Sequence, residues 1–272
     1  MSMTLYGLAA SPFVSRVLLV ATLKGIDLPL AMPAIDEAFG RMTERMKILS
    51  RDPRAALDPV QFMEGTPFMR DVNPQGRMPA LTVDGRHLAE SMAICEFLDE
   101  RFPSPPLMPT DPFERAKVRQ ICCMCDLSLT SQLLPLAEQI DPLGRDEAKL
   151  ARTIQEIERS LRELQQVMGP GPWAWGEQAS LADCMLLFSV LFFQVKLSTT
   201  TENLGVVAFD ADRPFPGHPK LRAWWRHLDG HAVFGAAIRR YRKDYDDLFT
   251  QMLPDRTPAS YGIWFRARAP RS

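Results

Sequence analysis

The sequence has no long hydrophobic run and no excess of charge of one sign. Its longest apolar stretch, residues 185–195, is interrupted by Ser189 and Gln194, whereas a helix needs about 20 apolar residues to cross a bilayer. Lysine and arginine total 32 against 33 aspartate and glutamate residues, which gives a formal net charge of -1. We therefore expect a buried core helix at 185–195, no membrane association and no nucleic acid partner, because nucleic acid binding needs an excess of basic charge.

Cysteine is scarce as well, with five residues in a chain of 272. That number is too small for a disulfide scaffold, and Cys122, Cys123 and Cys125 lie close together, which indicates a reducing compartment. No apolar run near the N-terminus carries the cleavage site of a secretory signal, so we expect a cytoplasmic protein.

Motifs of several enzyme and metal-binding classes are missing. There is no Gly-x-Gly-x-x-Gly, no Gly-Lys-Ser/Thr phosphate loop and no Gly-x-Ser-x-Gly elbow. Zinc ribbons need two Cys-x-x-Cys pairs and this sequence has one, while its four histidines show no metal-ligand spacing. We expect no metal, and we interpret Cys122 and Cys125 as a buried, inert helix face.

The first hundred residues alternate strand and helix patterns. Short apolar runs at 4–8, 28–31, 80–83 and 86–89 predict strands, and Asp84-Gly85 is a strong hairpin signal between the last two. Helical spacing of apolar residues predicts helices at 12–23 and 91–102. The order β-α-β followed by β-β-α predicts a small α/β domain over residues 1–102.

A proline-rich segment separates this domain from the remainder. Residues 103–111 contain four prolines and are interpreted as a stiff linker. Residues 112–253 show only helical patterns, which predicts an all-α domain, and residues 254–272 lack periodicity and are interpreted as a tail. The expected helices cover residues 112–133, 145–168, 181–197, 218–229 and 232–249.

An insertion near 32–72 makes the first domain unusually long. The sequence predicts a helix at about 35–49 within it. Two interpretations stay open, a surface insertion and a flap over the active site.

Ser11 stands at the turn from the first strand to the first helix. Ser11-Pro12 is a typical helix start, since serine is a good N-cap and proline fits the first helical position. By itself, Ser11 is therefore interpreted as a helix cap. The same place also suits an anion, because a helix N-terminus offers unpaired N–H groups and a positive dipole end.

Two further segments identify a family resemblance. Residues 73–81 (Asn-Pro-Gln-Gly-Arg-Met-Pro-Ala-Leu) and residues 90–94 (Glu-Ser-Met-Ala-Ile), separated by the Asp84-Gly85 turn, resemble the glutathione S-transferase family. Residues 180–183 (Ser-Leu-Ala-Asp) and the pattern of His218, Pro219, Leu221 and Trp224 are similar to that family's helical domain. The resemblance implies a thioredoxin-like N-terminal domain, an all-α C-terminal domain, a homodimer, and glutathione as co-substrate.

The resemblance also implies roles for residues in these segments. Pro79 would be a cis-proline, and the backbone of Met78 would pair with the extended tripeptide. Ser91 would bind the glutamyl carboxylate and Glu90 the glutamyl ammonium group. Arg77 would either help to hold glutathione or be a solvated surface charge.

Ser11 is then the predicted catalytic residue, because its hydroxyl can donate a hydrogen bond to the glutathione thiolate. Relatives that act as thiol reductases carry cysteines at the positions of Ser11 and Val14, so disulfide exchange at this turn is disfavoured. Ser15 and Tyr6 are the alternatives for thiol activation. A pocket for the electrophile is expected between the domains, with Phe13, Arg115 and Arg119 as candidates.

The resulting hypothesis is an enzyme that attacks a hydrophobic, electrophilic small molecule with glutathione thiolate. Residues 90–112 are locally similar to bacterial β-etherases, so glutathione-dependent cleavage of an aryl ether is an alternative reaction. A glutathione peroxidase or reductase side activity also stays open. The alternative from another class is a non-catalytic binding or scaffold protein that keeps this fold.

Overall fold

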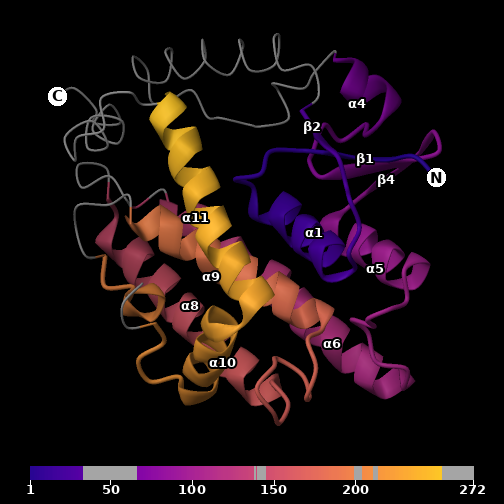
Figure 1. Ribbon diagram of the computed structural model, residues 1–272. Coiled ribbons are helices and arrows are strands. Elements are labelled where there is room, and N and C mark those ends of the chain that lie inside the picture. The colour runs from indigo at the N-terminus through magenta and orange to yellow at the C-terminus, as the bar shows by residue number, and fades with distance from the viewer. Residues whose placement is uncertain (33–65, 138, 140–144, 199–203, 211–213, 253–272) are drawn as a thin grey trace, which may run out of the picture.

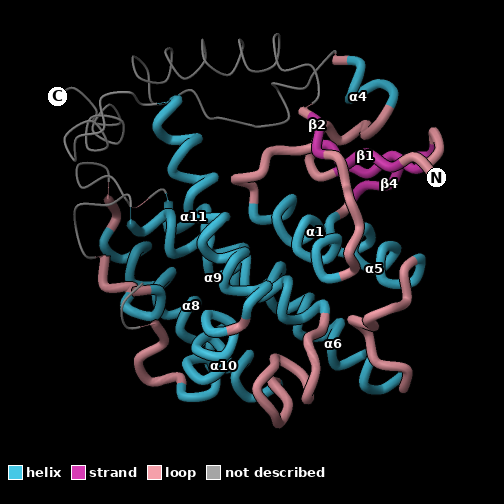
Figure 2. Tube along the Cα trace, in the orientation of Figure 1, coloured by secondary structure: helices cyan, strands magenta, loops and turns pink. Residues whose placement is uncertain are grey.

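The computed structural model describes residues 1–32, 66–137, 139, 145–198, 204–210 and 214–252. Its N-terminal part is a small sheet with helices on both faces. Its C-terminal part is a group of helices that packs against one helix of the N-terminal part (Figure 1). All strands of the described residues belong to the N-terminal part (Figure 2). This arrangement is that of a thioredoxin-like domain followed by an all-α domain, as predicted.

The sheet has the strand order β2-β1-β3-β4. The strands are β1 (Met3–Tyr6), β2 (Leu30–Ala31), β3 (Ala80–Val83) and β4 (Arg86–Ala89). β2 is parallel to β1, whereas β3 is antiparallel to both β1 and β4. β3 and β4 have the predicted bounds because the Asp84-Gly85 turn fixes their register, whereas β1 and β2 are shorter than predicted.

Alternating residues of β1 face different helices, as the two-residue period of a strand requires. Leu5 is fully buried in the main core together with residues of α1 (Pro12–Leu23), whereas Tyr6 packs on Phe68 of the short helix α4 (Pro67–Asp71). α5 (Ser91–Arg101) lies beside α1 on the same face of the sheet (Figure 1). The three helices therefore cover both faces and leave the strand ends open.

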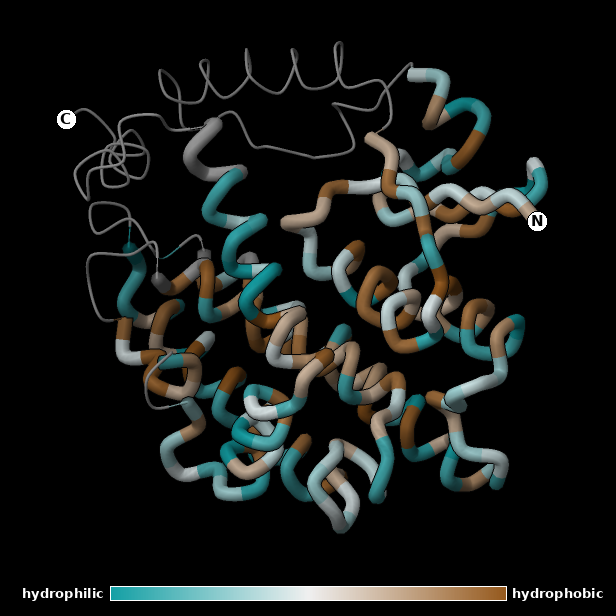
Figure 3. The backbone as a smooth tube through the Cα atoms, in the orientation of Figure 1, coloured by the Kyte–Doolittle hydropathy of each residue, from teal (hydrophilic) through white to brown (hydrophobic). Residues whose placement is uncertain are grey.

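Helix α1 is buried along most of its length. Its outer side packs against α9 (Leu181–Ser198) and α11 (Ala232–Met252) of the helical part. Hydrophobic residues concentrate along α1 and α9 (Figure 3), and Val14, Val17 and Val20 are fully buried. A helix with apolar residues all round is expected in this central position.

The helical part follows the predicted pattern closely. Besides α9 and α11, it contains α6 (Pro112–Met124), α8 (Glu147–Val167) and α10 (Pro219–Gly230), together with a short 3-10 turn η3 (Val207–Phe209). The apolar stretch 185–195 lies inside α9, as predicted, and most of its residues are buried. None of the helices in the described ranges combines the length and apolar composition that crossing a bilayer requires.

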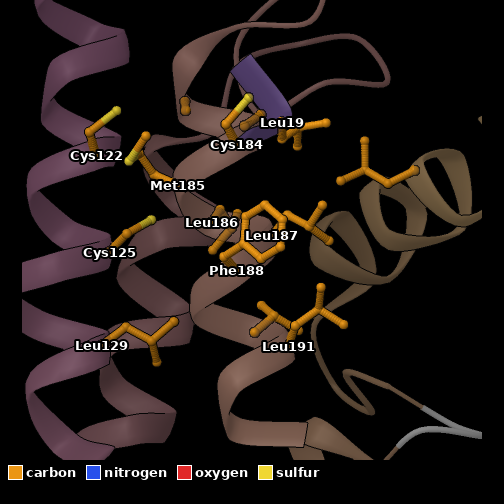
Figure 4. Close-up of a cluster of buried hydrophobic side chains, with 14 of the residues drawn as sticks. Leu19, Cys122, Cys125, Leu129, Cys184, Met185, Leu186, Leu187, Phe188 and Leu191 are labelled. Carbon is orange, nitrogen blue, oxygen red and sulfur yellow. The ribbon is translucent and has the colours of Figure 1, made fainter. Parts of the chain in front are cut away.

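The helix predicted at 112–133 is irregular and longer. α6 continues into a π-helical turn η1 (Cys125–Leu129), a 3-10 turn η2 (Thr130–Gln132) and α7 (Leu133–Ala137). Pro135 lies in the first turn of α7, where proline is tolerated. Cys122, Cys125 and Leu129 point toward α9 (Figure 4), so the interpretation of Cys122 and Cys125 as a buried helix face is confirmed.

Several expectations fall on other segments. The helix expected at 35–49, the choice between surface insertion and flap, and the tail at 254–272 lie outside the described residues. The division at 103–111 stays a prediction.

Candidate active site

Three loops meet at one end of the sheet. Tyr6 pairs with Ala80, and Ala80 pairs with Ala89. The last residues of β1 and β4 and the first residue of β3 therefore lie at the same end of the sheet. The residues that follow β1, precede β3 and follow β4 therefore lie together there. They include Ser11, the Arg77–Pro79 segment and the pair Glu90 and Ser91, which the sequence had placed in one site.

Ser11 is positioned by a tight loop. At Gly7, a Cβ atom would lie 2.4 Å from the Val14 side chain, so glycine allows the chain to fold back onto α1. The N–H of Ser11 donates to Leu8 O (2.9 Å), and its own carbonyl accepts from Ser15 N–H (2.9 Å), which begins the helix. The loop thus fixes the Ser11 backbone at the N-terminal end of α1.

The Ser11 side chain does not cap the helix. Its hydroxyl makes no capping hydrogen bond, although its backbone has the extended conformation of an N-cap. Thr66, Asp111 and Asp146 occupy the same position in α4, α6 and α8, and each accepts a backbone N–H. The local interpretation of Ser11 as a helix cap is therefore wrong for its side chain, and its hydroxyl is left at the positive end of α1.

The two alternatives to Ser11 are engaged elsewhere. The Ser15 hydroxyl donates to Ala9 O at 2.6 Å and is buried, so it pins the loop between β1 and α1. The Tyr6 ring packs on Phe68 with a centroid distance of 5.6 Å. Both side chains thus have structural contacts that account for them.

The second loop is shaped by Asn73. Its side chain donates to Arg77 O (2.7 Å) and accepts from Gln75 N–H (3.1 Å), and Gly76 takes a positive φ of 64° that suits glycine. The Met78–Pro79 peptide is cis, as predicted.

Met78 presents its backbone at the edge of this loop. Within the described part of the chain, the N–H and C=O of Met78 form no hydrogen bond. An extended peptide laid along this residue would find a free donor and a free acceptor.

The third loop joins β4 to α5. Glu90 has φ 68°, an unfavourable value for a residue with a side chain, and such strain concentrates at functional sites. The first helical hydrogen bond is donated by Ile94 N–H to Glu90 O (2.9 Å), so the N–H groups of Ser91, Met92 and Ala93 have no acceptor within the helix. Ser91 is buried at the first position of α5, and Glu90 is exposed.

The sequence did not single out Arg16, which lies between these loops and the helical part. Its side chain is fully buried, and Nη1 lies 2.9 Å from Asp126 Oδ1 and 3.5 Å from Ser91 Oγ. Its guanidinium carbon lies 4.9 Å from the centroid of the Phe13 ring. The signal in the sequence was an arginine inside the apolar face of the first helix.

The other predicted site residues lie apart or at the surface. Arg119 forms two hydrogen bonds with Glu96 of α5 (2.7 and 2.9 Å), and Arg115 lies 3.6 Å from Glu100. Both arginines thus join α6 to α5. Arg77 is exposed.

Four of the five cysteines are unsuited to chemistry at neutral pH. Cys95, Cys122, Cys125 and Cys184 are buried, and burial raises the pKa of each thiol, that of Cys95 to about 12. Cys123 is exposed. The described residues contain no group of three side chains that would hold a metal ion.

Residues 10–101 match the family model described as the N-terminal domain of glutathione S-transferase. This part of the chain is thus similar to the N-terminal domain of the glutathione S-transferase family. Maleylacetoacetate isomerase from Pseudomonas aeruginosa is 37% identical over 119 residues, which cover 43% of this chain and 56% of that relative. The match thus spans about half the length of the relative.

Solved glutathione S-transferase structures share the fold over most of this chain. A delta-class glutathione transferase from Nilaparvata lugens has a TM-score of 0.64 at 20% identity, and the match covers 92% of this chain and all (100%) of that structure. A maleylacetoacetate isomerase from Anaeromyxobacter dehalogenans, solved with bound glutathione (GSH), has a TM-score of 0.57 at 23% identity over 87% of this chain and 94% of its own. At these identities the likeness concerns the fold.

The site itself is suited to an anionic ligand with an extended backbone. It combines two helix N-termini, two serine hydroxyls, a free backbone donor and acceptor at Met78, and the exposed carboxylate of Glu90. Such a set binds negative groups at the helix ends and one cation at Glu90.

Proposed function

We propose that this protein is a glutathione transferase that binds glutathione at the end of its sheet and activates the thiol through Ser11. The observation that carries the proposal is the Ser11 hydroxyl, which caps nothing and lies at the same sheet end as Met78, Pro79 and Ser91. A helix-start serine that serves only stability would be expected to accept a backbone N–H.

The role of Ser11 is to stabilise the thiolate. An ordinary thiol has a pKa of ~8.5, and lowering it by ~2 units requires ~2.7 kcal/mol. A hydrogen bond from a hydroxyl to a charged sulfur contributes ~1.5–3 kcal/mol, and the dipole of α1 adds to it. Together they make the thiolate the main species near neutral pH, ready to attack an electrophile.

The other predicted residues hold the tripeptide. Met78 pairs with its backbone beside the cis-proline Pro79, Ser91 and the N-terminus of α5 bind the glutamyl carboxylate, and Glu90 binds the glutamyl ammonium group. Arg77 is exposed and is kept as a peripheral contact.

The electrophile side is assigned to the boundary with α6. Phe13 is kept as a candidate there, since it lies two residues after Ser11 and is half-buried. Arg115 and Arg119 have carboxylate partners on α5, so they enter this proposal only as residues at the rim.

A second candidate reaction is isomerisation. The relative from Pseudomonas aeruginosa carries the name maleylacetoacetate isomerase, and a thiolate that adds reversibly to an activated double bond can isomerise it. Aryl ether cleavage is kept as a further alternative from the sequence. Assays with an aryl halide, an aryl ether and a cis-configured unsaturated diacid, each with glutathione, distinguish the three.

The decisive experiment is a titration of the protein with glutathione, in which calorimetry measures the heat of binding and thermal unfolding measures the melting temperature. A ligand present at 100 times its dissociation constant stabilises the native state by ~2.7 kcal/mol, so the melting temperature is expected to rise. The control is ophthalmic acid, which replaces the thiol by a methyl group and should bind without forming a thiolate. No heat and no stabilisation at millimolar glutathione would contradict the proposal and favour a scaffold protein.

We also propose that the protein is a homodimer and that it is located in the cytoplasm. Sedimentation equilibrium of the full chain tests the dimer, and fractionation of the source cells tests the location.

A further inference from the structure

A fully buried cation lies beside the candidate site and has no role in the chemistry proposed above. Arg16 is 0% exposed, and Nη1 contacts both carboxylate oxygens of Asp126 at 2.9 Å. Among the described residues, its Nε and Nη2 atoms have no hydrogen-bond partner. Buried charged groups with open donors are costly and call for an explanation.

The counter-ion comes from the other domain. Asp126 lies in the π-helical turn η1, next to the fully buried Cys125, and its side chain is 31% exposed. A π-helical turn changes the direction in which the residues on a helix point and is frequent at functional sites. Here the turn carries a carboxylate that pairs with α1, so Arg16 connects α1 of the sheet domain with the helical part.

The second partner of Arg16 is Ser91, a predicted ligand-binding residue. Nη1 lies 3.5 Å from Ser91 Oγ, a long contact in which the positive charge faces the oxygen of the hydroxyl. A serine hydroxyl has one donor and two acceptor sites. A cation on its acceptor side leaves the O–H free to donate outward, toward the open N–H groups at the start of α5.

We propose that Arg16 is a positioning residue for the glutamyl carboxylate of glutathione. It holds the Ser91 hydroxyl as a donor, adds positive charge to the N-terminus of α5, and is itself held by Asp126 of the helical domain. The inference rests on the proposed function, because it assigns the glutamyl end of the same ligand.

A second buried ion pair in the same helices shows what a purely structural pair looks like. Lys24 and Asp99 join the C-terminal ends of α1 and α5, which lie away from the candidate site. Lys24 Nζ is 2.5 Å from Asp99 Oδ1. Asp99 also accepts Leu107 N–H (2.7 Å), and Lys24 also donates to Pro105 O. That pair is far along both helices from the site and ties them to the segment after α5, whereas Arg16 keeps donors open beside Ser91.

The test compares glutathione affinity among variants by calorimetry. Arg16→Met is expected to weaken glutathione binding roughly 5–30-fold, and Arg16→Lys to recover part of the loss because it restores the charge. In the Ser91→Ala background the same Arg16→Met change should have a much smaller effect. Lys24→Met is the matched control, since it removes an equally buried cation and should lower the melting temperature without changing the affinity.

Asp126→Asn gives a readout of opposite sign. It removes the negative charge that offsets Arg16, so the melting temperature should fall while glutathione binds a few-fold more tightly. If Asp126 only held the domains together, its substitution would lower both the melting temperature and the affinity for glutathione. This variant also keeps the proposal testable if Arg16→Met fails to fold.

The outcomes separate the two proposals. If the wild-type protein does not bind glutathione, the proposed function is wrong and the role of Arg16 is wrong with it. Two results would overturn only the role of Arg16. In the first, the wild type and Arg16→Met bind glutathione equally well. In the second, Arg16→Met lowers the affinity by the same factor in the Ser91→Ala background as in the wild-type background. Weaker binding by Asp126→Asn would also overturn it.

Discussion

In the helical part of the chain, side chains of the N-cap residues close the N-termini of α6 and α8. Asp111 accepts hydrogen bonds from Phe113 and Glu114 N–H groups (both 2.9 Å), and Asp146 accepts from Lys149 N–H (3.0 Å). At the end of the sheet, α1 follows Ser11 and α5 follows Glu90, and neither residue makes a side-chain capping bond. Two helices that meet at the candidate site thus start with open N–H groups.

The difference separates the residues that stabilise the fold from those that serve a ligand. A capped terminus satisfies its donors within the protein, and removing the cap then costs stability. An uncapped terminus gives up that stabilisation and keeps its donors for an anion. Substitutions at the two kinds of terminus should therefore affect different measurements.

The largest effect on stability is expected at the start of α9. Asp183 is fully buried and accepts four hydrogen bonds, from Ala174 N–H (2.7 Å), Ser180 N–H (2.8 Å), Ser180 Oγ–H (2.9 Å) and Trp224 Nε1–H (2.9 Å). Asp183→Ala leaves these donors unpaired at ~1–3 kcal/mol each, so urea unfolding should show a loss of about 4 kcal/mol or more.

The control for this prediction is the exposed Asp229 of α10. Asp229→Ala should change the free energy of unfolding by no more than ~0.5 kcal/mol. Glutathione affinity of the folded Asp183→Ala protein should equal that of the wild type, since the groups that donate to Asp183 all lie in the helical part. An Asp183→Ala protein as stable as Asp229→Ala would show that the buried carboxylate contributes no net stability.

The same contrast explains how much of the fold was predictable. Residues 80–83 and 86–89 were predicted to the residue, because strand alternation and an Asp-Gly turn are local signals. Helices α8, α9, α10 and α11 were found from apolar spacing, with ends displaced by at most three residues. The π-helical turn within 125–129 was not predicted, because it packs against α8 and α9, contacts that the local sequence does not show.

The site was predictable in part. The family motifs predicted Ser11, Met78, Pro79, Glu90 and Ser91 as site residues, and the strand register brings their loops to one sheet end. Arg16 and Asp126 were missed because they are 110 positions apart in the sequence and pair only after the domains pack. The orientation of the Ser11 hydroxyl could not be predicted either, because the sequence does not distinguish a serine that caps a helix from one that does not.

The largest effect on catalysis is expected at Ser11. Ser11→Ala removes thiolate stabilisation of ~1.5–3 kcal/mol, so turnover near neutral pH should fall roughly 10–150-fold. Stability should stay within ~0.5 kcal/mol of the wild type, because the hydroxyl caps nothing. Ultraviolet absorbance of the bound thiolate against pH should show a higher thiol pKa in the variant, with little change in glutathione affinity.

Ser15→Ala is the matched control, the same substitution one helical turn further along α1. Its hydroxyl donates to Ala9 O at 2.6 Å, so its loss should lower stability by ~1 kcal/mol and leave the thiol pKa unchanged. Superimposable thiolate titrations of wild type and Ser11→Ala would assign thiol activation to another residue. A raised thiol pKa in Ser15→Ala would name that residue.

The smallest effect is expected at a terminus that is capped and remote from the thiol. Asp111 accepts two backbone N–H groups at the start of α6, so Asp111→Ala should cost about 1 kcal/mol in urea unfolding. Asp111→Asn should retain most of that stability, because asparagine is an equally good N-cap. Both variants should give the wild-type thiolate titration. If Asp111→Ala is instead as stable as wild type but raises the thiol pKa, capped and uncapped termini do not divide stability from function, and the comparison between the two regions is wrong.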